Sequence, residues 1–395
     1  MTATNHDFDD FSPATLSQRG SVKWSFYGAR VLAAWVAEMD FAAAPPVRQA
    51  ILDAVAREEF GYPLPDEISP LPEATATWEQ RRYGWTVEPT RIHTVPDVLR
   101  GVELAVEQYS PTDSAVLLPT PAYMPFFEIP KAIRRPTVEV PTVRDEHGVR
   151  TLDYDRIDDA FAAGAGTIIL CNPYNPLGRS FTVSELTDLV GIVDRHGGRV
   201  VADEIHAPLT YSGHRHVPYA SISEAAADHS VTVVSASKAW NLAGLKCAQV
   251  ILNSTRDDAR WRSISLMRTH GASPIGVRAN VAAYLDGGPW LDDLIVYLDG
   301  NRQLLAELLS AQLPAVEYTP PDATYLAWLD CRALELDVEP AQFFLDEAKV
   351  ATNAGPAFGG DGAGHIRFNF ATSKAILCQA VEAMAAAVTR HRIGP

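Results

Sequence analysis

The chain has 395 residues, of which 47% are hydrophobic and 21% are charged, and its formal net charge at pH 7 is −16. This length predicts two or more domains, and the composition is that of a globular protein. The acidic balance argues against a nucleic-acid partner, because phosphate binding needs a basic face. No run of about 20 apolar residues, the length that crosses a membrane, occurs in the sequence.

The cysteines and the N-terminus bear on where the protein works. Four cysteines lie far apart without C-x-x-C spacing, at Cys171, Cys247, Cys331 and Cys378. This pattern suits reduced thiols better than a disulfide framework. The first residues, "MTATNHDFDDF", lack the apolar run of a signal peptide. We therefore expect a cytoplasmic protein.

The first forty residues are irregular, and from there to about residue 255 the sequence predicts helices that alternate with short buried strands. Residues 45–59 place apolar side chains at helical spacing after two prolines, which predicts a helix. Continuous apolar runs follow in "SAVLLPTP", "GTIILCNP", "GRVVADE" and "SVTVVSASK". Between two of them, "TVSELTDLVGIVDRHG" predicts a helix with a capping box from Thr182 to Glu185 and a glycine at its end. This alternation indicates a largely parallel sheet with both faces covered.

The last hundred residues have a different pattern. Residues 291–313 predict a long amphipathic helix, "ATYLAWLD" and "HIRFNFA" alternate as half-buried strands do, and a closing helix covers residues 373–391. We therefore predict an α/β large domain over residues 46–289. Residues 1–45 and 290–395 would form a smaller α+β domain.

Polar side chains follow the predicted strands, where ligands bind in open α/β sheets. The residues in these positions are Tyr123, Asn175, Asp203, His206, Ser235, Ser237 and Lys238. The set suits pyridoxal 5'-phosphate (PLP), which needs a carboxylate for its ring nitrogen, a flat ring against its face and donors for its phenolic oxygen. Serines and a cation would receive its phosphate, and a lysine would form a Schiff base with it.

These motifs also resemble a known family. "SASKAWNLAGLK", "CNPYNPLGR" and "DEIHAPL" are similar to motifs of the fold-type-I PLP-dependent enzymes, the aspartate aminotransferase superfamily. Within it, "WVAEMDF", "FGYP", "PAYMPFF" and "HVPYAS" most resemble the cystathionine β-lyase group (MalY/PatB type). The resemblance runs nearly end to end. It implies a mostly parallel, seven-stranded sheet in the large domain and a homodimer with shared active sites.

The resemblance assigns roles around the PLP ring. It makes Lys238 the Schiff-base lysine and the acid and base at the substrate Cα. Asp203 would pair with the ring nitrogen, and Asn175 would bind the phenolic oxygen with His206 nearby. Tyr123 would stack on the ring.

The resemblance assigns a second group of residues to the phosphate and the substrate. The phosphate would be bound by Ser235, Ser237, Lys246 and the backbone N–H groups of Val98 and Leu99. Arg367, in "HIRFNF", would bind the α-carboxylate of an amino-acid substrate with both guanidinium arms. Tyr62, in "FGYP", would reach the phosphate in the neighbouring subunit.

Two positions depart from the pattern of the superfamily. Lys246 stands where many members have arginine, so the phosphate would be bound by a compact ammonium group rather than by a bidentate guanidinium. Asp97 stands at a helix start where glycine is common, and it brings negative charge toward a phosphate.

The implied reaction is β-elimination from L-cystathionine or a related L-cysteine S-conjugate, giving a thiol, pyruvate and ammonia. An aminotransferase acting on an L-amino acid shares every step up to the Cα carbanion and remains an alternative. A regulator-binding role is a third alternative, for which the sequence offers no docking motif.

Two other sequence patterns are not assigned to a ligand-binding site. His214 and His216 lack a third ligand at suitable spacing, so no metal site is predicted. The glycine-rich residues 355–364 have no P-loop lysine after them, and we interpret them as a flexible loop at the mouth of the site.

Overall fold

The central sheet has seven strands, and the structure, a computed structural model, describes residues 8–146 and 148–393. The strand order is β2 (Ile92–Val95), β10 (Ala248–Leu252), β9 (Ser230–Val234), β8 (Arg199–Asp203), β7 (Ala165–Cys171), β3 (Ala115–Thr120) and β4 (Thr137–Pro141). Strand β10 is antiparallel to both of its neighbours, and every other neighbouring pair is parallel. The predicted mostly parallel, seven-stranded sheet is confirmed.

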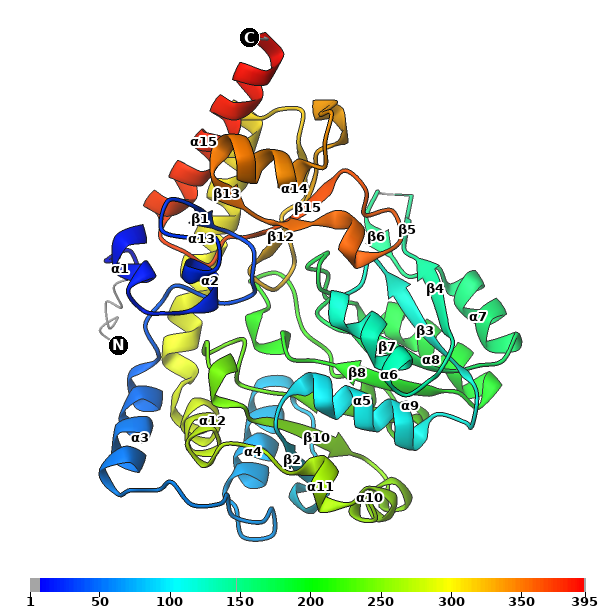
Figure 1. Cartoon of the computed structure of the whole chain (residues 1–395). Coiled ribbons are helices and arrows are strands. Elements are labelled where there is room, and N and C mark those ends of the chain that lie inside the picture. Colours follow the sequence, from blue (N-terminus) through cyan, green and yellow to red (C-terminus); the bar gives the residue numbers. More distant parts are fainter. Residues whose placement is uncertain (1–7, 147, 394–395) are drawn as a thin grey trace.

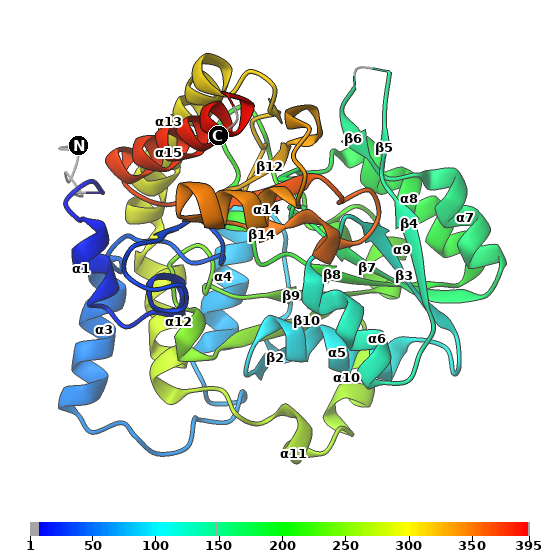
Figure 2. The ribbon, with the colours of Figure 1, turned by 45° about the horizontal axis from the view of Figure 1, so that its top comes forward.

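Helices cover both faces of this sheet (Figure 2). On one side lie α5 (Val98–Tyr109) and α6 (Glu128–Ala132), and on the other lie α7 (Tyr154–Ala162), α8 (Val183–His196) and α9 (Glu224–His229). Every residue of β7 and β9 is buried. Burial on both faces is why these strands read as continuous apolar runs rather than alternating ones.

Helix α8 shows how local sequence sets the ends of an element. The Thr182 side chain accepts a hydrogen bond from the Glu185 N–H, and the Glu185 side chain accepts one from the Thr182 N–H. The helix ends at Gly197, whose φ of 61° is in the left-handed region. The predicted capping box and terminal glycine are confirmed.

A second, antiparallel sheet lies in the C-terminal part of the chain. Its strand order is β11 (Glu317–Tyr318), β12 (Leu326–Asp330), β15 (His365–Asn369) and β14 (Asn353–Ala354). The helices α13 (Gly288–Gln312), α14 (Pro340–Phe343) and α15 (Lys374–Ile393) pack around it (Figure 1). The N-terminal segment joins this half, because β1 (Leu32–Ala33) pairs in parallel with β13 (Val350–Ala351).

Helix α13 connects the two halves of the molecule. In Figure 1 it begins beside α12 (Pro274–Asp286), next to the large sheet, and extends upward to lie against α15. The predicted domain boundary between residues 289 and 290 therefore falls in the first turn of a continuous helix. The boundaries stay a prediction, although the two sheets lie on either side of this position.

The remaining elements complete the fold around the two sheets. They are α1 (Pro13–Ser17), α2 (Val22–Ser25), α3 (Pro45–Ala56), α4 (Leu71–Tyr83), β5 (Val143–Arg144), β6 (Arg150–Thr151), α10 (Thr255–Arg262) and α11 (Leu266–Thr269), with 3-10 turns at Pro89–Arg91, Met124–Phe127, Ala207–Leu209, Tyr219–Ser221, Ala243–Leu245, Arg332–Leu334 and Gly355–Phe358, and a π-helical turn at Phe344–Ala348. Within the described residues, none of the helices has the length and apolar character needed to span a membrane.

Candidate active site

A cavity of about 210 Å³ opens at the carboxyl ends of β7, β8 and β9. Its lining comes from several strand ends and from the start of α5. The lining residues are Ala37, Pro96, Asp97, Val98, Leu99, Tyr123, Cys171, Asn175, Asp203, Ile205, His206, Ser237, Lys238, Ala243, Lys246 and Cys247. The structure thus brings most of the residues predicted from the strand ends to one place.

Lys238 lies in the turn that follows β9. The turn is anchored by Trp240, which is fully buried and donates from Nε1 to the Gly287 carbonyl at 3.1 Å. The Lys238 Nζ donates to the Ala37 carbonyl at 2.8 Å. Burial, with the positive charge of Arg367, lowers the pKa of Lys238 to about 8. A large share of this amine is therefore neutral near pH 8, as a nucleophile or base requires.

Asp203 ends β8 and faces the cavity as a buried carboxylate. It is 4% exposed, and its Oδ1 accepts a hydrogen bond from the Ile205 N–H at 3.1 Å. Burial raises the pKa of Asp203 to about 7. A protonated ring nitrogen next to this carboxylate would offset the cost of burying its charge.

Three further predicted residues present polar groups to the cavity. Among the described residues, the buried Nδ1 of His206 has no hydrogen-bond partner. Burial also holds the pKa of His206 well below its usual value, so the ring is neutral. Asn175 accepts a hydrogen bond at Oδ1 from Arg367 Nη1 at 3.1 Å, which leaves its amide N–H groups as donors. Burial raises the pKa of Tyr123, so its phenol is also neutral.

Arg367 comes from the second sheet and lies behind Asn175, outside the cavity lining. Its Nη2 donates to the Trp35 carbonyl at 3.1 Å and to Asn353 Oδ1 at 2.7 Å, and its guanidinium carbon lies 5.1 Å from the centre of the Phe358 ring. Burial lowers the pKa of Arg367 to about 10, so the group is charged at neutral pH. Its partners are neutral oxygens rather than carboxylates, which leaves this charge available to an anionic substrate group.

Residues 35–40 form a segment that the sequence did not assign to the site. The Ala37 carbonyl accepts hydrogen bonds from both Lys238 Nζ and the Tyr325 hydroxyl. Asn369 on β15 donates to two further carbonyls of the segment, those of Val36 and Glu38, at 2.7 Å each. The segment "WVAEMDF" supported the family resemblance only, because backbone carbonyls leave no side-chain signal in a sequence.

The predicted phosphate-binding residues divide into two sets. Ser237, Lys246, Val98 and Leu99 line the cavity, together with Asp97. Ser235 does not line it: its hydroxyl donates to the Cys247 carbonyl at 2.7 Å and accepts from the Ser237 N–H at 3.0 Å. This placement makes Ser235 a support for the turn that carries Ser237.

Tyr62 lies away from this cavity. Its side chain is fully exposed, and it lines a separate hollow of about 260 Å³ with Pro274 and Val277. Its predicted role concerns the neighbouring subunit and stays a prediction.

The residues of the cavity fit PLP. The unpartnered His206 Nδ1, the free Asn175 amide and the buried Asp203 are groups that need a polar partner, and PLP carries a phenolic oxygen and a ring nitrogen. Lys238 supplies the amine for its aldehyde. At the other end, Ser237 and the start of α5 offer donors to a phosphate.

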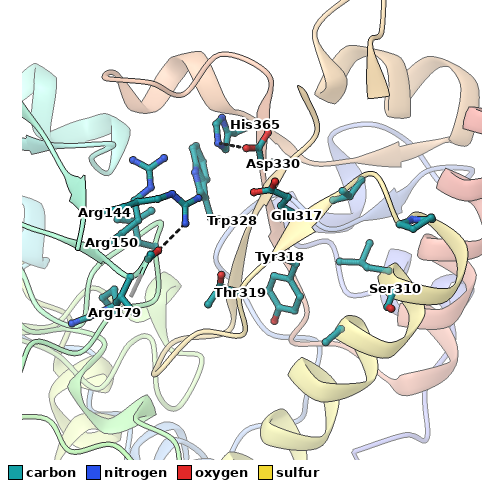
Figure 3. Close-up of a pocket in the computed structure, with 17 residues that line it drawn as sticks. Arg144, Arg150, Arg179, Ser310, Glu317, Tyr318, Thr319, Trp328, Asp330 and His365 are labelled. Carbon is teal, nitrogen blue, oxygen red and sulfur yellow. Dashed lines mark hydrogen bonds and ion pairs between the residues drawn. The ribbon is translucent and has the colours of Figure 1, made fainter. Parts of the chain in front are cut away.

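A larger cavity, of about 580 Å³, lies between the two sheets, where the β5–β6 hairpin faces α13 and β12 (Figure 3). Three of its charged side chains are paired within the chain. Arg150 Nη2 lies 2.5 Å from Asp361 Oδ2, Arg179 bonds Glu185, and Asp330 bonds Arg332. Size alone therefore does not identify the active site, because the smaller cavity holds Lys238, Asp203 and the unpartnered Nδ1 of His206.

The glycine-rich residues 355–364 lie beside the site. The Phe358 carbonyl accepts from the Ala122 N–H at 2.7 Å, next to Tyr123 in the chain. A Cβ added to Gly355 would lie 1.9 Å from the Gly362 carbonyl oxygen. A side chain at Gly355 would clash with this carbonyl, so the glycine permits close packing of the loop on itself. The predicted flexibility of the loop stays a prediction.

The two histidines of "GHRHVP" have separate partners. His216 Nε2 lies 2.9 Å from Glu204 Oε2, and His214 Nδ1 lies 3.3 Å from Asp322 Oδ1. The described residues contain no group of three or more side chains placed to hold a metal ion.

Residues 36–384 match the family model for aminotransferase class I and II. The chain belongs to this family. It is 40% identical to the cystathionine beta-lyase of Corynebacterium glutamicum, over 92% of this chain and 95% of that protein. It is 36% identical to the cystathionine beta-lyase PatB of Bacillus subtilis, over 93% of this chain and 97% of that protein. It therefore belongs to the cystathionine β-lyase group within the family.

A solved structure agrees with this assignment. The PLP-bound C-S lyase from Staphylococcus hominis aligns with a TM-score of 0.88 and 29% identity, covering 94% of this chain and 96% of that one. The predicted membership in the PLP-dependent fold-type-I enzymes and in their C–S lyase group is confirmed.

Proposed function

We propose that this chain is a PLP-dependent carbon–sulfur β-lyase acting on L-cystathionine or a related L-cysteine S-conjugate. With water, such a substrate gives a thiol, pyruvate and ammonia. The observation that carries the proposal is the convergence of Lys238, Asp203 and Asn175 on one cavity, with Arg367 bonded to Asn175, in a chain related to cystathionine β-lyases.

Arg367 orients the substrate. Its guanidinium is positively charged, buried and free of carboxylate partners, so it can bind the α-carboxylate with two parallel hydrogen bonds. Asn175 and Asn353 hold the two arms of this guanidinium in place. An α-carboxylate fixed in this way sets the position of Cα relative to Lys238.

PLP, when bound, supplies an electron-withdrawing ring that stabilises negative charge at the substrate Cα. Asp203 would keep its ring nitrogen protonated, and Asn175 and His206 would lie near its phenolic oxygen. Lys238 would remove the Cα proton, a role that suits an amine with a pKa of about 8. The Ala37 carbonyl holds Nζ in the cavity and so keeps this base close to the substrate.

The experiment is to incubate the purified protein with PLP and L-cystathionine and to measure pyruvate and free thiol. The proposal expects both products in equal amounts without any added keto acid, and neither from the Lys238→Ala variant. Conversion that requires a keto acid, without thiol release, would instead support the aminotransferase alternative that the family assignment keeps open.

A homodimer with shared active sites completes the proposal. Exposed apolar side chains of the loop between α3 and α4 and of helix α11 support it, namely Phe60, Tyr62, Leu64, Ile68, Leu266 and Met267. Tyr62 would reach the phosphate of the partner's PLP from this surface. A cytoplasmic location is also proposed, and it is supported by the four unpaired cysteines, three of them buried.

A further inference from the structure

A carboxylate lies among the groups expected to bind the PLP phosphate. Asp97 lines the same cavity as Val98, Leu99, Ser237 and Lys246. It is the N-cap residue of α5, and its Oδ1 accepts a hydrogen bond from the Arg100 N–H at 2.9 Å. A phosphate at a helix start is normally favoured by the helix dipole and the free N–H groups, and a carboxylate there opposes it.

The same carboxylate also binds the cation that the phosphate needs. Lys246 Nζ lies 2.8 Å from Asp97 Oδ2. One oxygen of Asp97 therefore caps the helix while the other pairs with Lys246. A phosphate that approaches Lys246 has to share this ammonium with Asp97 or displace it.

The fold holds Lys246 in this position. Its backbone has φ 46°, in the left-handed region that favours glycine, and its carbonyl accepts from the Ser273 N–H at 2.9 Å. The next residue, Cys247, precedes β10 and its carbonyl binds the Ser235 hydroxyl. The backbone on both sides of the lysine is thus fixed, and only its side chain is free to change partner.

The ion pair can exchange its partner easily. The Lys246 and Asp97 side chains are 57% and 38% exposed, and ion pairs this open to solvent are weak. Little is lost when Lys246 turns from the carboxylate to a phosphate, while the negative charge of Asp97 stays next to that phosphate.

We propose that Asp97 lowers the affinity of this chain for the PLP phosphate by competing with it for Lys246. In the cofactor-free protein Asp97 holds Lys246 at the helix start. In the loaded protein its negative charge repels the phosphate and so weakens binding of the cofactor. This inference rests on the proposed function, because it needs PLP in this cavity.

The test is to measure the dissociation constant of PLP for the full-length protein by equilibrium dialysis, reading bound PLP by absorbance. Asp97→Asn keeps an oxygen that caps α5 and removes the charge. We expect it to bind PLP roughly two- to five-fold more tightly, from the size of an exposed charge interaction. Pyridoxal, which has no phosphate, should bind the variant and the wild type equally.

Two controls separate competition from a general effect. Asp153→Asn changes another N-cap aspartate, on α7, and should leave PLP binding unchanged. In the background Lys246→Gln, the gain from Asp97→Asn should shrink, because the two charges act on each other. Asp97→Ser, which also caps a helix, replaces the first variant if that one unfolds.

The outcomes distinguish this inference from the proposed function. If the wild type binds no PLP, the proposed function fails. If the wild type binds PLP and removing the charge of Asp97 leaves its affinity equal or weaker, the competition proposed here is wrong. A gain that appears equally with pyridoxal would also overturn it.

Discussion

Lys238 and Asp203 are charged in water, and burial shifts both toward their neutral forms. The pKa of Lys238 falls to about 8 and that of Asp203 rises to about 7. Such shifts in opposite directions are typical of sites that move protons. They also mean that burying Lys238 and Asp203 lowers the free energy of unfolding until a bound ligand supplies opposite charges to these two groups.

Asp203→Asn tests that cost. The folded-state pKa lies above the usual 3.8, so this carboxyl favours folding most at pH values below 3.8 and progressively loses that effect as the pH rises through 7. The substitution should raise the free energy of unfolding of cofactor-free protein at pH 8 by about 2–4 kcal/mol, and change it little at pH 4. Denaturant unfolding at both pH values measures this.

The control for this substitution is Asp337→Asn, at an exposed aspartate. This substitution should leave the free energy of unfolding unchanged at both pH 4 and pH 8. Equal stability of Asp203→Asn and the wild type at pH 8 would contradict the raised pKa.

Arg367→Lys tests the role in substrate binding. A lysine cannot reproduce the fork that meets Asn175, Asn353 and a carboxylate together. We expect kcat/KM for L-cystathionine to fall by about 100-fold, mainly through KM, because two charge-assisted hydrogen bonds are lost. Arg332→Lys, at an exposed arginine, is the control. A KM that does not rise would refute the assignment.

At the scale of elements, the segment of residues 35–40 connects the two halves of the site. It contacts Lys238 through the Ala37 carbonyl and Arg367 through the Trp35 carbonyl. Asn369 on β15 holds it with two hydrogen bonds and is itself 1% exposed. The segment thus contacts both the proposed base and the arginine proposed to bind the substrate carboxylate.

Much of the site could be predicted from side chains at strand ends, because Asn175, Asp203 and Lys238 each follow a recognisable apolar run. The rest depends on contacts between distant residues. Asn369 and Val36 are 333 positions apart, and the interaction involves a carbonyl that every residue has. The sequence also could not show that the Ser235 hydroxyl bonds the Cys247 carbonyl instead of lining the cavity. A serine that follows a strand can point to either side.

Asn369→Ala tests the segment. Removing an amide that bonds buried carbonyls should lower the free energy of unfolding by about 2–3 kcal/mol and also lower kcat. The matched control is Asn301→Ala, because Asn301 is fully buried and donates to the Phe370 and Thr372 carbonyls. It should cost similar stability with a smaller change in kcat. Equal losses of kcat in both variants would show that stability alone explains the effect.

At the scale of the whole molecule, the site lies between the two sheets. Lys238 and Asp203 follow strands of the large sheet, while Arg367 is on β15 of the second (Figure 1). The Arg150–Asp361 ion pair also joins the two halves, and Arg150 lines the larger cavity of Figure 3. The proposed function therefore needs residues from both halves, and the proposed dimer would add Tyr62 from a second copy.

Leu266→Asp combined with Met267→Asp tests the dimer. These side chains are 74% and 76% exposed in the single chain, and charges there should oppose burial in an interface. We expect the dimer dissociation constant to rise at least about 100-fold and pyruvate formation to fall with it. Sedimentation in the analytical ultracentrifuge measures the dimer dissociation constant. Ile393→Asp, at the far end of α15, should change neither. Full activity in a monomer would contradict shared active sites.

The most direct test of the central claim is chemical labelling of Lys238. The purified protein is incubated with PLP, reduced with borohydride to make any imine permanent, digested and analysed by mass spectrometry. The account predicts that the peptide containing Lys238 carries the mass of reduced PLP and that Lys238→Ala abolishes the label. An unlabelled Lys238, or a label confined to another lysine, would contradict it.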